Sequence, residues 1–347
     1  MQRLTSMSIV SFLLASCLAG NMPSFAECAK PGDSADAVPS DSESNSGRKF
    51  SADLKPQQPD PDKRKGVRKG NAPCLAWTDP QVPPYAVILC VHGLGLHNGT
   101  YEAFGKEMCK RGIAIYAIDV RGFGSWVKAN GREKVDFDGC LEDVRTTLKV
   151  IRKYNKGLPV FILGESMGGA IALRVADLYP NLIDGLISSV PAGDRFQQKK
   201  TSLKVALHLL AGPNKPFNIG SQIVGQATDK QELRDAWCND PLTKLNLSPV
   251  ELIQFQSFMN ENHASAKRIC STPVLLVQGC KDKLVRPEGT VELYNELATP
   301  DRKLELISSA EHLIFEEGQF NEQVLDLVET WVKGHLKGSI KNESVNP

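Results

Sequence analysis

Residues 164–169 read Gly-Glu-Ser-Met-Gly-Gly, and they separate an apolar run at 159–163 from a helix-like run at 170–176. A serine with glycines two residues before and two after it, on a turn from a strand into a helix, is typical of a nucleophile elbow. The small residues let the chain bend sharply enough to expose the hydroxyl. The start of the helix would place free N–H groups beside an anion that forms there. We therefore predict that Ser166 is a nucleophile, against the alternative of a Gly-rich turn with a structural serine.

A candidate acid and a candidate base follow in the order that this kind of site requires, which is serine, then aspartate or glutamate, then histidine. The run at 273–279 indicates a strand, and Asp282 lies just past its end. The alternating run at 303–308 indicates another strand, and His312 follows it. We expect His312 to accept the proton of the serine and Asp282 to orient His312.

The sequence offers alternative candidates for both Asp282 and His312. Asp301 is the second candidate acid, but its Pro-Asp-Arg context is typical of a turn. His263 is the nearest rival base, but it lies in a polar stretch with no strand before it. A solvated turn aspartate and an exposed loop histidine remain the alternative interpretations of Asp282 and His312.

An upstream turn supplies candidate donors for a tetrahedral oxyanion, which needs preorganised N–H groups. The buried-strand run at 85–91 ends in His92-Gly93-Leu94-Gly95, which is similar to the H-G-x-G turn of an oxyanion hole. We predict that the N–H groups of Leu94 and Met167 form the hole. We expect His92 to orient this turn by hydrogen bonding and not to act as a base.

With these residues identified, the chain resembles the α/β-hydrolase superfamily, and within it the monoacylglycerol lipase and lysophospholipase-like group. The resemblance rests on three segments in the order and spacing of that group, at 92–101, 118–125 and 164–169. It covers the chain from about residue 72 to 336. It implies an α/β-hydrolase fold, with a mostly parallel central sheet, helices on both faces and an inserted helical cap. The site residues that it implies are Ser166, Asp282, His312, Leu94 and Met167.

The resemblance implies a serine hydrolase that cleaves carboxylic esters, of acylglycerol or lysophospholipid type, through an acyl-enzyme. The apolar helical pattern from Leu203 to Leu210 would suit an acyl chain, but the same leucines would also pack a cap onto the core. Two alternatives stay open: an acyltransferase with the same triad, and a non-catalytic binding lipoprotein.

Composition narrows the classes of partner. The chain has 347 residues and 41% hydrophobic content, enough to bury one large core. Its 41 basic and 40 acidic residues give a net charge of +1, which does not favour a nucleic-acid partner. The histidines and cysteines lack the short paired spacings of zinc sites, and no phosphate-binding loop motif is present. We expect a small-molecule ester or lipid as substrate, and no cofactor or metal.

The N-terminus is typical of an export signal, with Arg3 followed by a short apolar run at 7–15. The residues that end at Cys17 resemble a bacterial lipobox, in which a lipidated cysteine would attach the protein to a membrane. An ordinary cleavage site after Ala26 is the alternative. Both predict an exported protein, periplasmic or at the cell surface, and the first predicts a membrane-anchored lipoprotein.

The patterns above also predict how the chain is divided into segments. The polar segment at 27–71 has too few apolar residues to fold by itself. The chain has nine cysteines, and Cys280 is expected to pair with Cys270 or to stay free. The expected segments are an export signal at 1–26, a polar tether at 27–71, core at 72–191, a helical cap at 192–268, core at 269–336 and a polar tail at 337–347.

Overall fold

The computed structural model describes residues 72–128, 133–191, 205 and 207–336. The export signal predicted at 1–26 with Cys17, the tether at 27–71 and the tail at 337–347 lie outside the described residues. Within the described ranges, no helix is both long enough and apolar enough to cross a membrane.

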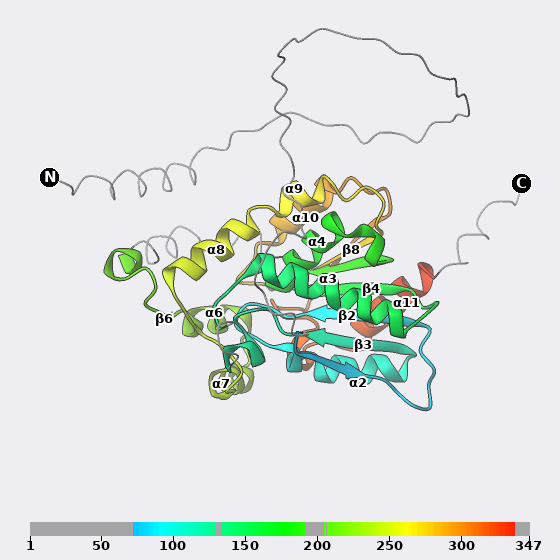
Figure 1. Cartoon of the computed structure of the whole chain (residues 1–347), viewed down its shortest axis with the longest axis horizontal. Coiled ribbons are helices and arrows are strands. Elements are labelled where there is room, and N and C mark those ends of the chain that lie inside the picture. The colour runs from blue at the N-terminus through cyan, green and yellow to red at the C-terminus, as the bar shows by residue number, and fades with distance from the viewer. Residues whose placement is uncertain (1–71, 129–132, 192–204, 206, 337–347) are drawn as a thin grey trace, which may run out of the picture. The chain divides into compact units, whose positions relative to one another are not determined.

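A seven-stranded sheet forms the centre of the fold (Figure 1), in the order β1-β3-β2-β4-β5-β8-β9. The edge strand β1 pairs antiparallel with β3, and every other pairing in this sheet is parallel. This agrees with the predicted mostly parallel sheet. The strands are β1 (Cys74–Trp77), β2 (Ala86–Val91), β3 (Ile113–Ile118), β4 (Val160–Glu165), β5 (Gly185–Ser189), β8 (Val274–Gly279) and β9 (Arg302–Ile307).

Helices cover both faces of the sheet, which explains why the central strands are continuous apolar runs. In β2, Val87, Leu89 and Val91 pack with residues of α3, α4 and α10 on one face. Alternate residues of the same strand pack with α2 and α11 on the other face. Figure 1 shows α3 and α2 on opposite sides of the sheet. These helices are α2 (Glu102–Lys110), α3 (Phe137–Tyr154), α4 (Met167–Leu178), α10 (Pro287–Glu296) and α11 (Glu322–Gly334), with short 3-10 turns η2 (Asn98–Tyr101), η3 (Gly124–Lys128), η4 (Pro180–Leu182) and η5 (Glu316–Gly318).

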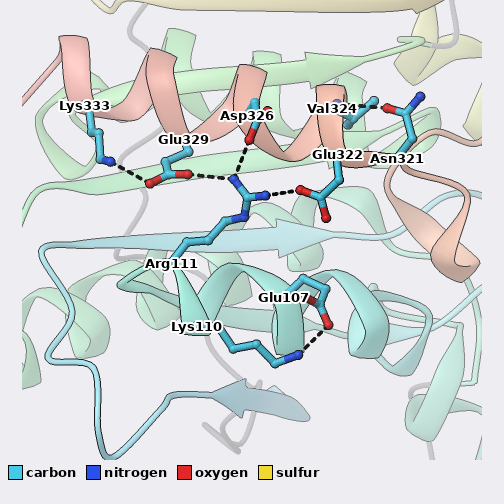
Figure 2. Close-up of polar contacts among 9 residues, drawn as sticks. All are labelled: Glu107, Lys110, Arg111, Asn321, Glu322, Val324, Asp326, Glu329 and Lys333. Carbon is cyan, nitrogen blue, oxygen red and sulfur yellow. Dashed lines mark hydrogen bonds and ion pairs between the residues drawn. The ribbon is translucent and has the colours of Figure 1, made fainter.

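An arginine at the end of α2 ties this helix to α11 (Figure 2). One guanidinium nitrogen of Arg111 lies 2.7 Å from Asp326 and 2.7 Å from Glu329, and another pairs with Glu322. The side chains of Arg111 and Glu329 are 21% and 19% exposed, so solvent screens their ion pair only in part, whereas Glu322 and Asp326 are largely exposed. The cluster therefore fixes two helices that lie far apart in the sequence.

The described part of the segment between β5 and β8 is mostly helical, and α6, α7 and α8 lie toward one end of the sheet (Figure 1). Of the predicted cap helix at 203–210, residues 203, 204 and 206 lie outside the described residues. Residues 207–211 are helical, and Leu207 and Leu210 are 60% and 77% exposed. The elements of this segment are β6 (Phe217–Asn218), α6 (Gly220–Ala227), α7 (Gln231–Asn239), β7 (Asn246–Leu247), α8 (Pro249–Met259) and α9 (Asn262–Ala266).

The cysteines near the second half of the core do not pair with each other. Cys280 carries a free thiol and is exposed, whereas Cys270 is disulfide-bonded. Of the two outcomes expected for Cys280, the structure therefore has the unpaired one.

Candidate functional site

Ser166 lies on a strained turn between β4 and α4. Its backbone angles, φ of 55° and ψ of −115°, fall in a region that residues other than glycine rarely adopt, as expected for a nucleophile elbow. A Cβ atom on Gly164 would lie 2.0 Å from the carbonyl oxygen of Gly168, and one on Gly168 would lie 1.8 Å from that of Val91. Both positions therefore require glycine, because the backbone passes too close for any side chain.

The three residues predicted as nucleophile, base and acid meet at the carboxyl ends of β4, β9 and β8. The Oγ of Ser166 lies 2.9 Å from Nε2 of His312. The Nδ1 of His312 lies 2.8 Å from Oδ2 of Asp282. Ser166, His312 and Asp282 are 6%, 2% and 5% exposed. Parallel strands bring these distant residues to one edge, so the structure places them in a continuous hydrogen-bonded chain.

The charges in this chain favour an ionised Asp282. Burial works to raise the pKa of this carboxyl, but the charge and hydrogen bond of His312 and the amides of Leu284 and Val285 outweigh it and leave the pKa lowered. Those two amides donate to Oδ1 at 2.7 and 2.9 Å. Burial works to lower the pKa of His312, but the charge of Asp282 outweighs it and leaves the pKa raised. An ionised Asp282 accepts the Nδ1 proton, so Nε2 is free to accept the proton of Ser166.

The predicted rivals lie elsewhere. His263 lies in the short helix α9, and its Nδ1 is 2.6 Å from Glu296. Asp301 lies 3.3 Å from His335 near the end of α11. Neither residue contacts Ser166 or His312 within the described part of the chain.

The turn after β2 lies beside Ser166. Leu94 and Ser166 line the same pocket, and Met167 begins α4, where the first N–H groups have no partner within the helix. Among the described residues, the N–H groups of Leu94 and Met167 make no hydrogen bond. Both predicted donors are therefore available to an oxyanion.

His92 orients this turn, as predicted. Its Nδ1 lies 2.8 Å from the carbonyl oxygen of Gly93, and its Nε2 accepts from the N–H of Val120 at 3.0 Å. Burial lowers the pKa of His92 to about 4, so the ring is neutral at physiological pH. Both ring nitrogens are occupied by the backbone, which leaves none for proton transfer with Ser166.

An apolar pocket opens from Ser166 toward the inserted helical segment. It measures about 650 Å³, including space that is open to solvent. Apart from Ser166 and His312, every lining residue is apolar, glycine or tryptophan. The lining residues are Gly93, Leu94, Leu96, Ser166, Ile223, Val224, Ala227, Trp237, Leu245, Phe255, Leu284, Val285, His312 and Leu313.

The inserted segment contacts the turn that carries Leu94. The N–H of Lys244 donates to the carbonyl oxygen of Gly95 at 2.8 Å. Nε2 of His97 lies 2.9 Å from Oδ2 of Asp240. Two polar contacts therefore join the inserted segment to the turn that carries Leu94.

Two buried glutamates beside the serine were not predicted. Glu165 precedes Ser166, and Glu316 follows His312 by four residues; both are fully buried. For Glu165, the only signal in the sequence was that a charged residue stands at the end of an apolar strand. Glu316 had none, because its partners Gly93 and Thr100 lie more than 200 residues earlier in the chain.

A mostly parallel sheet, a serine on a strand-to-helix turn, and a histidine and an aspartate on later loops define an α/β-hydrolase. The family described as serine aminopeptidase, S33 (Hydrolase_4) matches residues 82–319. The chain belongs to this family, and it is a carboxylic ester hydrolase of the monoacylglycerol lipase-like serine hydrolases.

The relatives support this placement. The chain is 27% identical to the monoacylglycerol lipase of Mycolicibacterium smegmatis over 75% of its own length and 92% of that enzyme. It is 29% identical to human monoglyceride lipase over 75% of its own length and 86% of that enzyme. The crystal structure of a soluble variant of monoglyceride lipase from Saccharomyces cerevisiae matches with a TM-score of 0.66 and 21% identity, over 76% of this chain and 91% of that one, which supports the fold.

Proposed function

We propose that this protein hydrolyses carboxylic esters of acylglycerol type by two-step acyl transfer to water at Ser166. One observation carries the proposal: the hydrogen-bonded chain of Ser166, His312 and Asp282 opens directly into an apolar pocket.

The chemistry follows from the geometry. Nε2 of His312 accepts the proton of Ser166 as Oγ attacks the ester carbonyl, and Asp282 stabilises the imidazolium that forms. The N–H groups of Leu94 and Met167 donate to the oxyanion. His312 then returns the proton to the leaving alcohol. Water next attacks the acyl-enzyme, with His312 again as base, and Ser166 is released.

The pocket supports an uncharged ester with an acyl chain. Its apolar walls would remove a hydrocarbon chain from water, which contributes about 0.8 kcal/mol for each buried methylene. None of the described lining residues is a lysine or an arginine that would pair with a phosphate. The relatives named monoacylglycerol lipase or monoglyceride lipase favour the same substrate class. We therefore favour a monoacylglycerol over a lysophospholipid.

The test compares wild type with Ser166→Ala and with Ser308→Ala, an exposed serine outside the site. We expect Ser166→Ala to abolish hydrolysis of p-nitrophenyl butyrate and labelling by a fluorophosphonate, and Ser308→Ala to keep both. Wild-type activity in Ser166→Ala would refute the proposal. A substrate panel should rank a monoacylglycerol above lysophosphatidylcholine and p-nitrophenyl acetate. Added alcohol acceptors would identify an acyltransferase if transfer exceeded hydrolysis.

We also propose that the protein is exported and anchored through a lipidated Cys17. The support is the short apolar run after Arg3 that ends at this cysteine. Metabolic labelling with a fatty-acid analogue should mark wild type and not Cys17→Ser. Equal labelling of both, or none of wild type, would contradict the anchor.

A further inference from the structure

Glu165 uses its buried carboxylate to fix the segment after His312. It accepts hydrogen bonds from the N–H groups of Ile314 at 2.7 Å, Phe315 at 3.1 Å and Glu316 at 2.9 Å. The hydroxyl of Ser189 donates to it at 2.9 Å. Backbone N–H groups can only donate, and they reach both carboxylate oxygens. Glu165 therefore fits this site as an acceptor on both oxygens, which requires the ionised form.

Glu316 has different partners. Its Oε1 accepts from the N–H of Gly93 at 2.8 Å. Its Oε2 is in hydrogen-bond contact with Oγ1 of Thr100, which also lies 2.7 Å from the carbonyl oxygen of His97. Thr100 has one hydroxyl proton, and the carbonyl can only accept it. The structure records the Thr100 hydroxyl against both acceptors. A proton on Glu316 would complete both contacts, because Thr100 could then donate to His97 and accept from Glu316.

The surroundings of Glu316 favour that protonation state. Burial, followed by the charge of Glu165, raises the pKa of Glu316 well above its usual range. Two neighbouring carboxyl groups in one buried site cannot both be ionised without a large cost in free energy. One carboxylate and one neutral acid satisfy every donor and acceptor described for the pair.

The two glutamates join three parts of the site. Glu165 is adjacent to Ser166 in the chain, and it holds the segment that follows His312. Glu316 holds Gly93, whose neighbour Leu94 is a proposed oxyanion donor. A Cβ atom placed on Gly93 would lie 3.4 Å from the Glu316 carboxyl and 3.6 Å from Cβ of Ser166, so these groups are near neighbours.

We propose that Glu165 and Glu316 are positioning residues of this site: Glu165, as a carboxylate, fixes the His312 segment, and Glu316, as a neutral acid, fixes the Gly93 turn. The proposal rests on the proposed ester hydrolysis at Ser166. It predicts that isosteric amides have opposite consequences at the two positions.

At position 316, glutamine replaces a neutral acid and can keep both contacts. Its amide oxygen accepts from Gly93, and its NH₂ donates to Thr100. Glu316→Gln should lower kcat no more than about threefold, whereas Glu316→Leu removes both contacts and should lower it about 30-fold or more. The loss should fall mainly on kcat, because Glu316 does not itself line the pocket and most of the pocket wall comes from other segments.

At position 165, glutamine cannot replace the carboxylate. Either orientation of the amide turns NH₂ toward backbone N–H groups, so Glu165→Gln should lower kcat about 30-fold or more. Glu142→Gln is the matched control, since Glu142 pairs with Arg145 on α3, and it should keep wild-type kcat. Thermal unfolding checks that each variant is folded.

Glu316→Gln decides the proposal even if another variant fails to fold. A loss of 30-fold or more in folded Glu316→Gln would overturn the neutral-acid assignment, and wild-type kcat in folded Glu316→Leu or Glu165→Gln would overturn the positioning role. Failure of the proposed function is a different result, in which wild type itself shows no hydrolysis that depends on Ser166.

Discussion

Asp282→Asn tests the hydrogen-bonded chain at its acidic end. The backbone amides of Leu284 and Val285 donate to Oδ1 at 2.7 and 2.9 Å, so asparagine should keep its carbonyl oxygen at that position. Its NH₂ group then faces Nδ1 of His312 and forces the ring proton onto Nε2. In that tautomer His312 cannot accept the proton of Ser166.

The size of the effect can be worked from these contacts. The flipped amide would restore the tautomer but would turn NH₂ against both backbone donors, at about 1–3 kcal/mol for each donor left unsatisfied. It would gain only the contact of Gln278, which lies 3.3 Å from Oδ2. The flipped form is therefore about 2–6 kcal/mol less stable. Together with the lost negative charge, we expect kcat to fall about 1,000- to 10,000-fold, which corresponds to about 4–5.5 kcal/mol.

The assay is steady-state hydrolysis of p-nitrophenyl butyrate, with circular dichroism to confirm folding. Asp301→Asn is the matched control, because Asp301 is an exposed aspartate that lies 3.3 Å from a different histidine, His335. It should keep wild-type kcat. A folded Asp282→Asn within tenfold of wild type would refute the assigned role of Asp282.

Three further predictions concern other parts of the molecule. Since Asp282 raises the pKa of His312, kcat/KM should fall as pH drops through a midpoint above the usual histidine value of about 6.5, because protonated His312 cannot accept a proton; a midpoint below 6.5 in a pH–rate profile would contradict this. Gly168→Ala should destabilise the fold by about 3 kcal/mol or more in urea unfolding, because its Cβ would meet backbone at 1.8 Å, while Gly225→Ala, with nothing within 4 Å, should not destabilise it. Arg111→Met should lower the free energy of unfolding by about 1 kcal/mol in dilute buffer and by less in 1 M NaCl, and a loss that salt leaves unchanged would exclude ion pairing as its cause.

Local chain signals were enough to find the elbow, the acid and the base. Ser166, Asp282 and His312 each follow a strand whose apolar pattern is visible in a few residues, and parallel pairing brings such positions to one edge. Asp282 and His312 remain predictions in their chemical roles, but the structure shows Asp282 in contact with His312 and His312 in contact with Ser166.

Contacts between distant segments could not be predicted in this way. The neutral state of Glu316 depends on Glu165, Gly93 and Thr100, which come from three other places in the chain. The pocket wall depends on how Trp237 and Phe255 fold back over Ser166, and no motif in the inserted segment indicates that path. Isolated patterns describe strands and turns, whereas buried polar partners depend on the whole fold.

The hydrogen bond between the inserted segment and the Gly95 turn links substrate choice to reaction rate. Lys244 holds Gly95 by a backbone hydrogen bond, and its neighbour Leu245 lines the pocket. A change in the inserted segment that makes room for a different acyl chain would therefore also move the turn that carries Leu94. Variants selected for a new chain length should often lose turnover on every ester, and recovery would need a second change that resets the turn. In a lineage of such enzymes, selectivity and speed would evolve as one trait.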